Sequence, residues 1–137
     1  MRFFFYGTLI DDDVRALVLG SSADGAAVCA ATLAGWSVVR VQGKTYPVIA
    51  RRRGTADGVL TGELDDSAFE RLVRYEGPEY EAAALDVTVT ETGEAVRAAV
   101  FVPSDQCRMS VSPWRFEDWQ RRHKREFLAR LRARGIA

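Results

Sequence analysis

The feature that most constrains this chain is an uninterrupted run of four aromatic residues, from Phe3 to Tyr6, which ends at Gly7. Successive side chains of a β-strand point to opposite faces of the sheet, so a run that is aromatic at every position needs apolar cover on both faces. The run therefore predicts a short strand that is buried on both sides and passes directly into a loop at Gly7. The rest of the chain has to supply that cover.

The composition is that of one globular domain. The 137 residues are 47% hydrophobic, and 19 basic residues balance 19 acidic ones, so the net charge indicates no class of partner. Cys29 and Cys107 lack the spacing of a metal site, and we expect both to be reduced thiols. Aspartates at 11–13 interrupt the apolar start, which argues against a signal peptide or a membrane span. We therefore expect a single domain over residues 1–137, located in the cytoplasm and without a membrane partner.

Hydrophobic periodicity and turn residues predict an alternation of short helices and strands. A first helix is expected after the aspartates at 11–13, with Gly20 as its end. Four strands are expected over 26–33, 36–41, 45–49 and 59–64, and their succession predicts a sheet that curls. Ser67 and Glu70 have capping-box spacing, so we expect a second helix over 67–75 that ends at Gly77.

The last third of the chain predicts a hairpin followed by a helix. Alternating apolar residues over 85–89 lead through the turn sequence ETGE into a second run at 96–102, and these two runs should pair antiparallel. From Arg115 onward a final helix is expected, with Trp119, His123, Phe127 and Leu131 forming its apolar stripe. Arginines interleaved with this stripe indicate a solvated helical face, so we expect no nucleic-acid partner.

One carboxylate stands out in the middle helix. Phe69, Leu72, Val73 and Glu76 are spaced at i, i+3, i+4 and i+7, which places Glu76 on the face whose other members should enter the core. A buried carboxylate must be protonated, hydrogen-bonded or set in a polar cavity, and each of these makes it a candidate acid or base. The alternative is that the last helical turn frays and Glu76 lies in solvent. Periodicity alone leaves both alternatives open.

The turn after the aromatic strand is a second candidate site. A tight turn at Gly7 that leads into a capped helix presents successive backbone N–H groups, which suit a carboxylate or a phosphate. Any strand that turns can need a glycine, so the pattern alone is weak.

Taken together, four segments resemble the gamma-glutamylcyclotransferase-like family, also called AIG2-like. They are FFFYGTL at 3–9, YPVI at 46–49, GVLTGEL at 58–64 and LVRYEGPEY at 72–80, in the family's order and spacing. The most specific element is the pairing of Tyr-Gly-Thr-Leu near the chain start with Tyr-Glu-Gly-x-x-Tyr some seventy residues later. The resemblance spans residues 3 to about 102.

The resemblance implies a fold, a set of site residues and a reaction. The fold is α/β in the α+β sense, with a curled, barrel-like mixed sheet, a few short helices, a C-terminal helix and a cavity at one end. The family's loop for the glutamyl end of the substrate corresponds to Tyr6, Gly7, Thr8 and Leu9, and its catalytic glutamate corresponds to Glu76. Tyr46 and Tyr80 are candidates for the cavity wall, with a place in the core as the alternative for either. The implied substrate is a small gamma-glutamyl compound, with no metal and no cofactor required.

These residue types suit the implied chemistry. In a gamma-glutamyl amide the free α-amine can attack the side-chain carbonyl to close a five-membered lactam, so that positioning alone accelerates the reaction. The attacking amine must lose protons and the leaving amine must gain one, and a single carboxylate between them can serve as base and then as acid. Glu76 is expected to be this carboxylate, and the Gly7–Leu9 amides are expected to bind the α-carboxylate.

The chain also departs from the family pattern at three positions. Many members have Asp where this chain has Val73, Arg shortly after the second tyrosine where it has EAAAL around Ala83, and a tyrosine where Phe101 stands. We expect these three positions to lie at the rim of the cavity, and the differences there leave the amine leaving group open. Three hypotheses therefore stand: a cyclotransferase that releases 5-oxoproline, a related enzyme that removes a gamma-glutamyl group from a specialised metabolite, and a non-catalytic module that binds a small carboxylate. Oligomeric state and pathway are not indicated.

Overall fold

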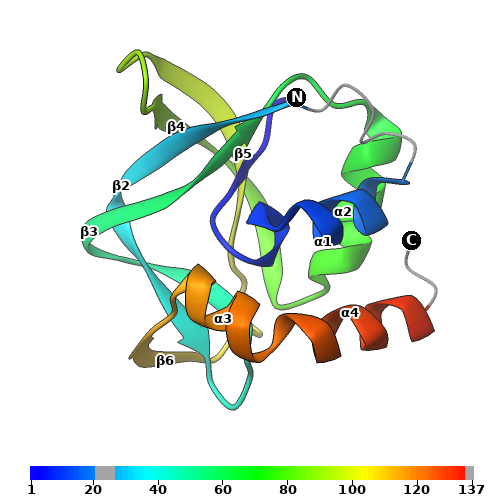
Figure 1. Cartoon of the computed structure of the whole chain (residues 1–137). Helices are drawn as coiled ribbons and strands as arrows, with labels where there is room; N and C mark the ends of the chain where they lie inside the picture. Colours follow the sequence, from blue (N-terminus) through cyan, green and yellow to red (C-terminus); the bar gives the residue numbers. More distant parts are fainter. Residues whose placement is uncertain (21–26, 135–137) are drawn as a thin grey trace.

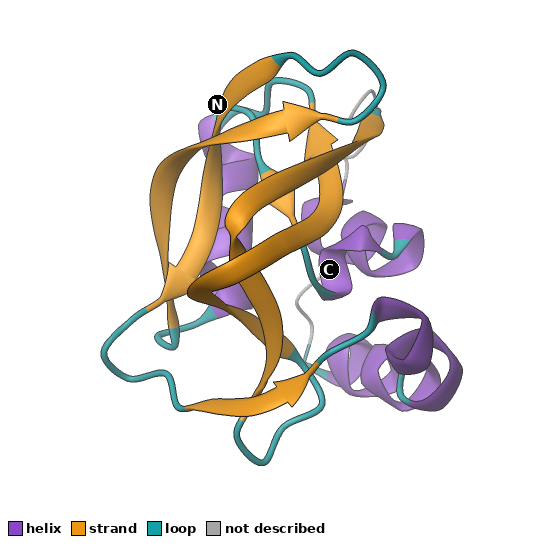
Figure 2. Cartoon of the chain, turned by 90° about the vertical axis from the view of Figure 1, so that its left-hand side faces the viewer, coloured by secondary structure: helices purple, strands orange, loops and turns teal. Residues whose placement is uncertain are grey.

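The computed structural model describes residues 1–20 and 27–134 and shows an α+β fold, as predicted, with a curled sheet on one side and the helices on the other (Figures 1 and 2). The strands are β1 (Phe4–Phe5), β2 (Val28–Val41), β3 (Pro47–Thr61), β4 (Tyr80–Val89), β5 (Ala95–Pro103) and β6 (Met109–Pro113). The helices are η1 (Thr8–Ile10), a 3₁₀ turn, and α1 (Asp12–Leu19), α2 (Asp66–Glu76), α3 (Phe116–Arg122) and α4 (Lys124–Ala133).

The sheet is a single antiparallel path that curls without closing. Its strand order is β1-β3-β2-β4-β5, and β6 pairs with β2 off this path. The two edge strands approach each other at one isolated parallel bridge between Phe3 and Ala99, where the Ala99 N–H donates to the carbonyl of Arg2 at 2.8 Å. The predicted curl is therefore confirmed, but the sheet does not close into a barrel. Within the described residues the strands pair antiparallel, and the Phe3–Ala99 bridge is the one parallel pairing.

The aromatic run forms the short strand β1, which is covered on both faces as the sequence predicted. Phe3 and Phe5 face the helices and join Leu72 and Trp119 in one core cluster. Phe4 and Tyr6 point the other way, into a second cluster inside the curl of the sheet. The strand is thus covered on both faces, which explains why it is aromatic at every position.

Four predicted strands are in fact two long ones. The segment at 36–41 and most of the segment at 26–33 belong to β2, with position 26 outside the described residues. Strand β3 contains residues 47–49 of the segment at 45–49 and residues 59–61 of the segment at 59–64. Gly35, with φ +88°, forms a bulge between Ala34 and Trp36 rather than a strand end. The polar middle of β3, from Arg51 to Thr55, is exposed, and its two ends pair with β2 as Trp36–Arg51 and Ala34–Thr55.

The first two helices lie close to their predicted positions. The Asp11 side chain caps α1 by accepting the N–H groups of Asp13 and Val14, and Gly20 ends the helix. For α2 the predicted capping box at Ser67 is wrong, because Asp65 is the N-cap and its carboxylate accepts the Ala68 N–H at 2.9 Å. The Asp65 side chain caps the backbone N–H three residues later, so the helix begins at Asp66, one residue earlier than predicted. Gly77 ends it, as predicted.

The predicted single C-terminal helix is divided in two. His123 has φ −125°, outside the helical region, and separates α3 from α4. The apolar stripe nevertheless faces the core, since Trp119 and Leu131 are buried. Strand β6 was not predicted: its apolar residues Met109 and Val111 alternate with serines, but the run is only five residues long and both apolar side chains are exposed. Within the described ranges, no helix combines the length and the apolar character needed to cross a bilayer.

Candidate active site

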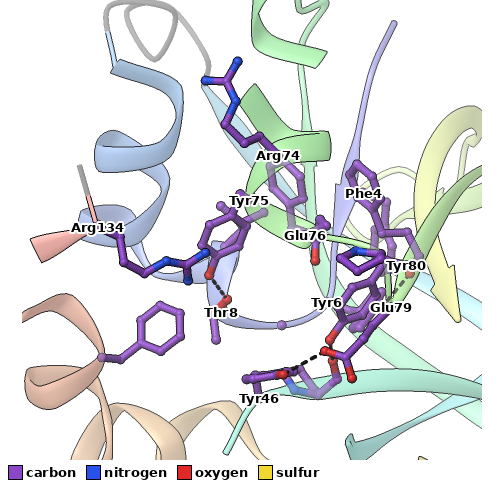
Figure 3. A pocket seen from close by; sticks show the side chains of 18 residues that line it. Phe4, Tyr6, Thr8, Tyr46, Arg74, Tyr75, Glu76, Glu79, Tyr80 and Arg134 are labelled. Atoms are coloured by element: carbon purple, nitrogen blue, oxygen red, sulfur yellow. Dashed lines mark hydrogen bonds between the residues drawn. The ribbon is translucent and has the colours of Figure 1, made fainter. Parts of the chain in front are cut away.

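A cavity of about 240 Å³ opens where η1, the C-terminal end of α2 and the first residues of β3 and β4 meet (Figure 3). All seven site residues predicted from the sequence line it: Tyr6, Gly7, Thr8, Leu9, Tyr46, Glu76 and Tyr80. The structure therefore brings together, from three separate parts of the chain, the residues that the motifs selected.

Glu76 reaches the cavity because it is the last residue of α2. The row that α2 buries runs through Ala68 and Leu72 at i and i+4, and Glu76 is the next member of this row. The predicted row was partly wrong, because Phe69 and Val73 are 39% and 46% exposed. The buried face of α2 is thus centred on Ala68 and Leu72 instead of on Phe69 and Val73. The predicted row and the observed row both contain Glu76 as their last member. Its side chain lines the cavity and does not swing away into solvent.

The environment of Glu76 favours its neutral form. Burial raises the pKa of its carboxyl from the ordinary value of 4.5 to about 8. Among the hydrogen bonds of residues 1–20 and 27–134, none involves the Glu76 side chain. A carboxyl with this pKa and no fixed partner can both accept and donate a proton near neutral pH, which is the requirement for a general acid/base.

The loop after β1 brings backbone N–H groups to the cavity. Gly7 opens η1, in which the N–H groups of Ile10 and Asp11 donate to the carbonyls of Gly7 and Thr8. As at the start of any helical turn, the N–H groups of Thr8 and Leu9 have no acceptor within the turn. A Cβ at position 7 would come within 2.7 Å of the Pro47 ring, so glycine is required by this close approach.

Three tyrosine phenols brace the walls. Tyr6 donates to the carbonyl of Phe101 and Tyr80 donates to the carbonyl of Pro47, both at 2.6 Å. Tyr46 donates to the Glu79 carboxylate at 2.8 Å. Burial, reinforced by the negative charge of Glu76, raises the pKa of Tyr6, and burial together with Glu79 raises the pKa of Tyr46 to about 12. The phenols are therefore neutral hydrogen-bond donors and hold the cavity in shape.

Several lining residues were not singled out from the sequence. The hydroxyls of Thr8 and Tyr75 lie 2.6 Å apart in a hydrogen bond that either can donate, and burial raises the pKa of Tyr75. Tyr75 and Glu79 both belong to the LVRYEGPEY segment, so the density of polar residues in that motif was an available signal. Arg74 and Arg134 also line the cavity. Nothing near Arg134 in the sequence points to the site.

Of the three positions where the chain departs from the family pattern, Phe101 alone lines the cavity. Val73 lies on the exposed side of α2 and Ala83 lies on β4, so the expectation that they form the rim is wrong. Their side chains are absent from the wall because the α2 stripe is rotated and because β4 leads away from the cavity after Tyr80. Among the described residues, no three His, Cys, Asp or Glu side chains are grouped so that they could hold a metal ion.

Comparisons with known proteins agree on one family. The family model described as "Gamma-glutamyl cyclotransferase, AIG2-like" matches residues 3–121. AIG2-like protein A of Arabidopsis thaliana is 29% identical over 128 residues, which cover 91% of this chain and 75% of that protein. The solution structure of another Arabidopsis thaliana protein superposes with a TM-score of 0.69 at 28% identity, covering 93% of this chain and 85% of that one. A solved gamma-glutamyl cyclotransferase superposes with a TM-score of 0.62 at 20% identity, covering 80% and 68%, and shares the fold.

Proposed function

Because this chain belongs to the gamma-glutamyl cyclotransferase, AIG2-like family, we propose that it releases 5-oxoproline and a free amine from a small gamma-glutamyl amine or peptide. The observation that carries the proposal is the Glu76 carboxyl, which burial brings to a pKa of about 8 inside a cavity lined by the Tyr6–Leu9 loop. In this proposal Glu76 is the general acid/base. The seven lining residues predicted from the motifs form the site.

The cavity favours a folded substrate. The backbone N–H groups of Thr8 and Leu9 bind the α-carboxylate of the glutamyl group, and the phenol-braced wall opposite confines its side chain. A volume of about 240 Å³ suits a compact glutamyl group together with a small leaving amine. Holding the α-amine against the γ-carbonyl makes the attack intramolecular, which can supply much of the rate enhancement.

Proton transfer then passes through one residue. The ionised Glu76 carboxylate accepts a proton from the α-ammonium, and the freed amine forms a C–N bond to the γ-carbonyl carbon. Glu76 then donates this proton to the leaving nitrogen as its bond to the γ-carbon breaks. The lactam nitrogen loses its second proton to solvent, and charges balance without any redox step. No metal or cofactor enters this scheme.

The test is release of 5-oxoproline from a panel of gamma-glutamyl amides, including gamma-glutamyl-alanine, gamma-glutamyl-epsilon-lysine and glutathione. We expect Glu76→Gln to lower turnover by about 100-fold or more, because Gln keeps the shape but cannot accept the proton. Glu70→Gln, on the exposed face of the same helix, is the matched control and should turn over like wild type. Circular dichroism checks that all three proteins are folded.

Comparable turnover in Glu76→Gln would refute its role. Release from a bulky or unusual amide only would identify the enzyme as specialised for another metabolite. Tight binding of a small carboxylate by the folded wild type, with no turnover of any amide, would instead indicate a binding module.

A further inference from the structure

Arg134 enters the cavity from a part of the chain that the family model does not match. It follows α4 as its C-cap, while the matched region ends at residue 121. Two other segments form the walls beside it, namely the loop at Thr8 and the end of α2 at Tyr75. The C-terminal helix thus adds a guanidinium to a site whose other functional groups come from residues before 102.

Within the cavity, Arg134 lies apart from the reacting end. In Figure 3 its side chain extends toward the Thr8–Tyr75 pair, while Glu76 lies beyond Tyr75, next to Tyr6 and Tyr80. Its positive charge acts on the phenols of Tyr75 and Tyr46, lowering their pKa values against the larger effect of burial. Burial raises the pKa of Glu76. The guanidinium therefore belongs to the outer, Tyr75 side of the cavity.

The charged groups that line the cavity leave the Arg134 guanidinium available to bind a substrate. No salt bridge among the described residues involves Arg134. Glu79 is bound by Tyr46, and Arg74 extends its guanidinium away from Glu76 in Figure 3. With Glu76 largely neutral at pH 7 and Glu79 already hydrogen-bonded, the Arg134 guanidinium favours a substrate that carries a negative charge on this side of the cavity.

We infer that Arg134 binds a carboxylate carried by the leaving amine, so that the preferred substrates are gamma-glutamyl amino acids or short peptides rather than gamma-glutamyl derivatives of neutral amines or polyamines. In the proposed mechanism the α-carboxylate of the glutamyl group already has another partner. That group shares a carbon with the attacking amine and must lie beside Glu76, at the Thr8–Leu9 amides. A carboxylate on the leaving amine lies further out, where a guanidinium can bind it through two hydrogen bonds. This inference rests on the proposed function.

The experiment compares two substrates that differ in one charge, gamma-glutamyl-alanine and gamma-glutamyl-alaninamide. For Arg134→Gln, kcat/KM should fall by about 10- to 100-fold for the acid and stay within about twofold for the amide. Arg132→Gln, an exposed arginine on the same helix that does not line the cavity, should change neither value. Arg134→Lys should recover part of the loss for the acid, since it restores the charge but not the planar pair of donors.

Two results would overturn the inference while the proposed function stands: equal losses for acid and amide, or no loss for either. If wild type turns over neither compound, the cyclotransferase proposal fails for this substrate class, and binding decides the role of Arg134. Affinities of both compounds are then measured by calorimetry for Glu76→Gln with and without Arg134→Gln. An affinity loss of about tenfold or more for the acid alone supports the carboxylate site, and equal affinities refute it.

Discussion

At the scale of single residues, the candidate site depends on one carboxyl whose burial is incompletely compensated. A carboxylate in a partly apolar wall without a hydrogen-bond donor is destabilised relative to its neutral form, and this is the physical cause of the raised pKa of Glu76. Glu79, three residues later, instead accepts a hydrogen bond from Tyr46. In the proposed function the two glutamates of the same motif therefore have different tasks: Glu76 exchanges protons, and Glu79 supports the wall through Tyr46.

The raised pKa of Glu76 has a consequence for the pH dependence of the proposed reaction. The free enzyme must hold Glu76 as a carboxylate to act as base, so kcat/KM should rise about tenfold per pH unit in acid and level off near pH 8. The rise reflects deprotonation, since a higher pH increases the fraction of the basic form. Initial rates of 5-oxoproline release between about pH 5.5 and 9 measure this profile. A profile already level at pH 6 would show that Glu76 has an ordinary pKa.

At the scale of elements, local patterns predicted those parts of the fold that local chemistry determines. The hairpin of β4 and β5 follows from alternation and a turn sequence, and the ends of α1 and α2 follow from Asp11, Gly20 and Gly77. The long strands could not be read in this way. Gly35 forms a bulge inside β2, and a glycine in a bulge looks in the sequence like a glycine at a strand end.

The residues of the candidate site also divide into those that local sequence motifs predicted and those that only tertiary packing brings to the cavity. The loop at Gly7 and the helix end at Glu76 lie in contiguous motifs, so both could be selected from the sequence. Arg134 lies far along the chain from either motif, and only the packing of α4 brings it to the cavity. The break at His123 sets the direction of α4, but no proline or glycine beside it in the sequence predicts a helix end there. Features created by tertiary packing alone were therefore missed.

The contact between Gly7 and Pro47 gives a prediction for the loop element. In Gly7→Ala the new Cβ would overlap the ring of Pro47. The backbone carbonyl of Pro47 accepts the Tyr80 hydroxyl, so either the Gly7 loop or this part of the cavity wall must shift. We expect a loss of about 1–3 kcal/mol in the free energy of unfolding and a drop in kcat/KM of about tenfold or more. Urea unfolding and 5-oxoproline release measure the two effects.

The matched control for this loop is Gly62→Ala. A Cβ at position 62 meets no atom within 4 Å, and Gly62 does not have the positive φ that would strain an alanine. Its stability and activity should therefore remain close to wild type. Equal behaviour of the two variants would show that the Gly7–Pro47 contact does not position the loop.

At the scale of the whole molecule, the cavity depends on attachment of the C-terminal helices to the start of the chain. Asp11 is 2% exposed, caps α1, and accepts hydrogen bonds from Lys124 at 2.8 Å and from Gln120 at 3.0 Å. Trp119 packs edge-to-face against Phe127, which also lines the cavity. Through these contacts α3 and α4 hold the wall residues Phe127 and Arg134 against the loop that follows β1.

Asp11 is therefore expected to contribute to stability and to the site at once. Asp11→Ala removes a helix cap and leaves Lys124 with Asp13 as its remaining ion-pair partner, so the free energy of unfolding should fall by about 2–4 kcal/mol. Asp12→Ala, which removes an exposed carboxylate from the same turn, should cost about 1 kcal/mol or less. Urea unfolding at pH 7 separates the two, and similar losses would contradict the attachment role of Asp11.

The pH dependence of stability tests whether the charge of Asp11 attaches the C-terminal helices. Burial by itself would raise the pKa of Asp11, but hydrogen bonds from Lys124, Gln120 and the Val14 N–H outweigh it and lower the pKa below 3.8. A group with a lowered pKa in the folded state contributes its stability above the unfolded value and loses it as the pH falls through the folded value. Wild type should thus lose the Asp11 contribution only below about pH 4, and the stability gap between wild type and Asp11→Ala should narrow from pH 5 to pH 2.5. A gap that stays constant over this range would show that the Asp11 charge does not hold α4 in place.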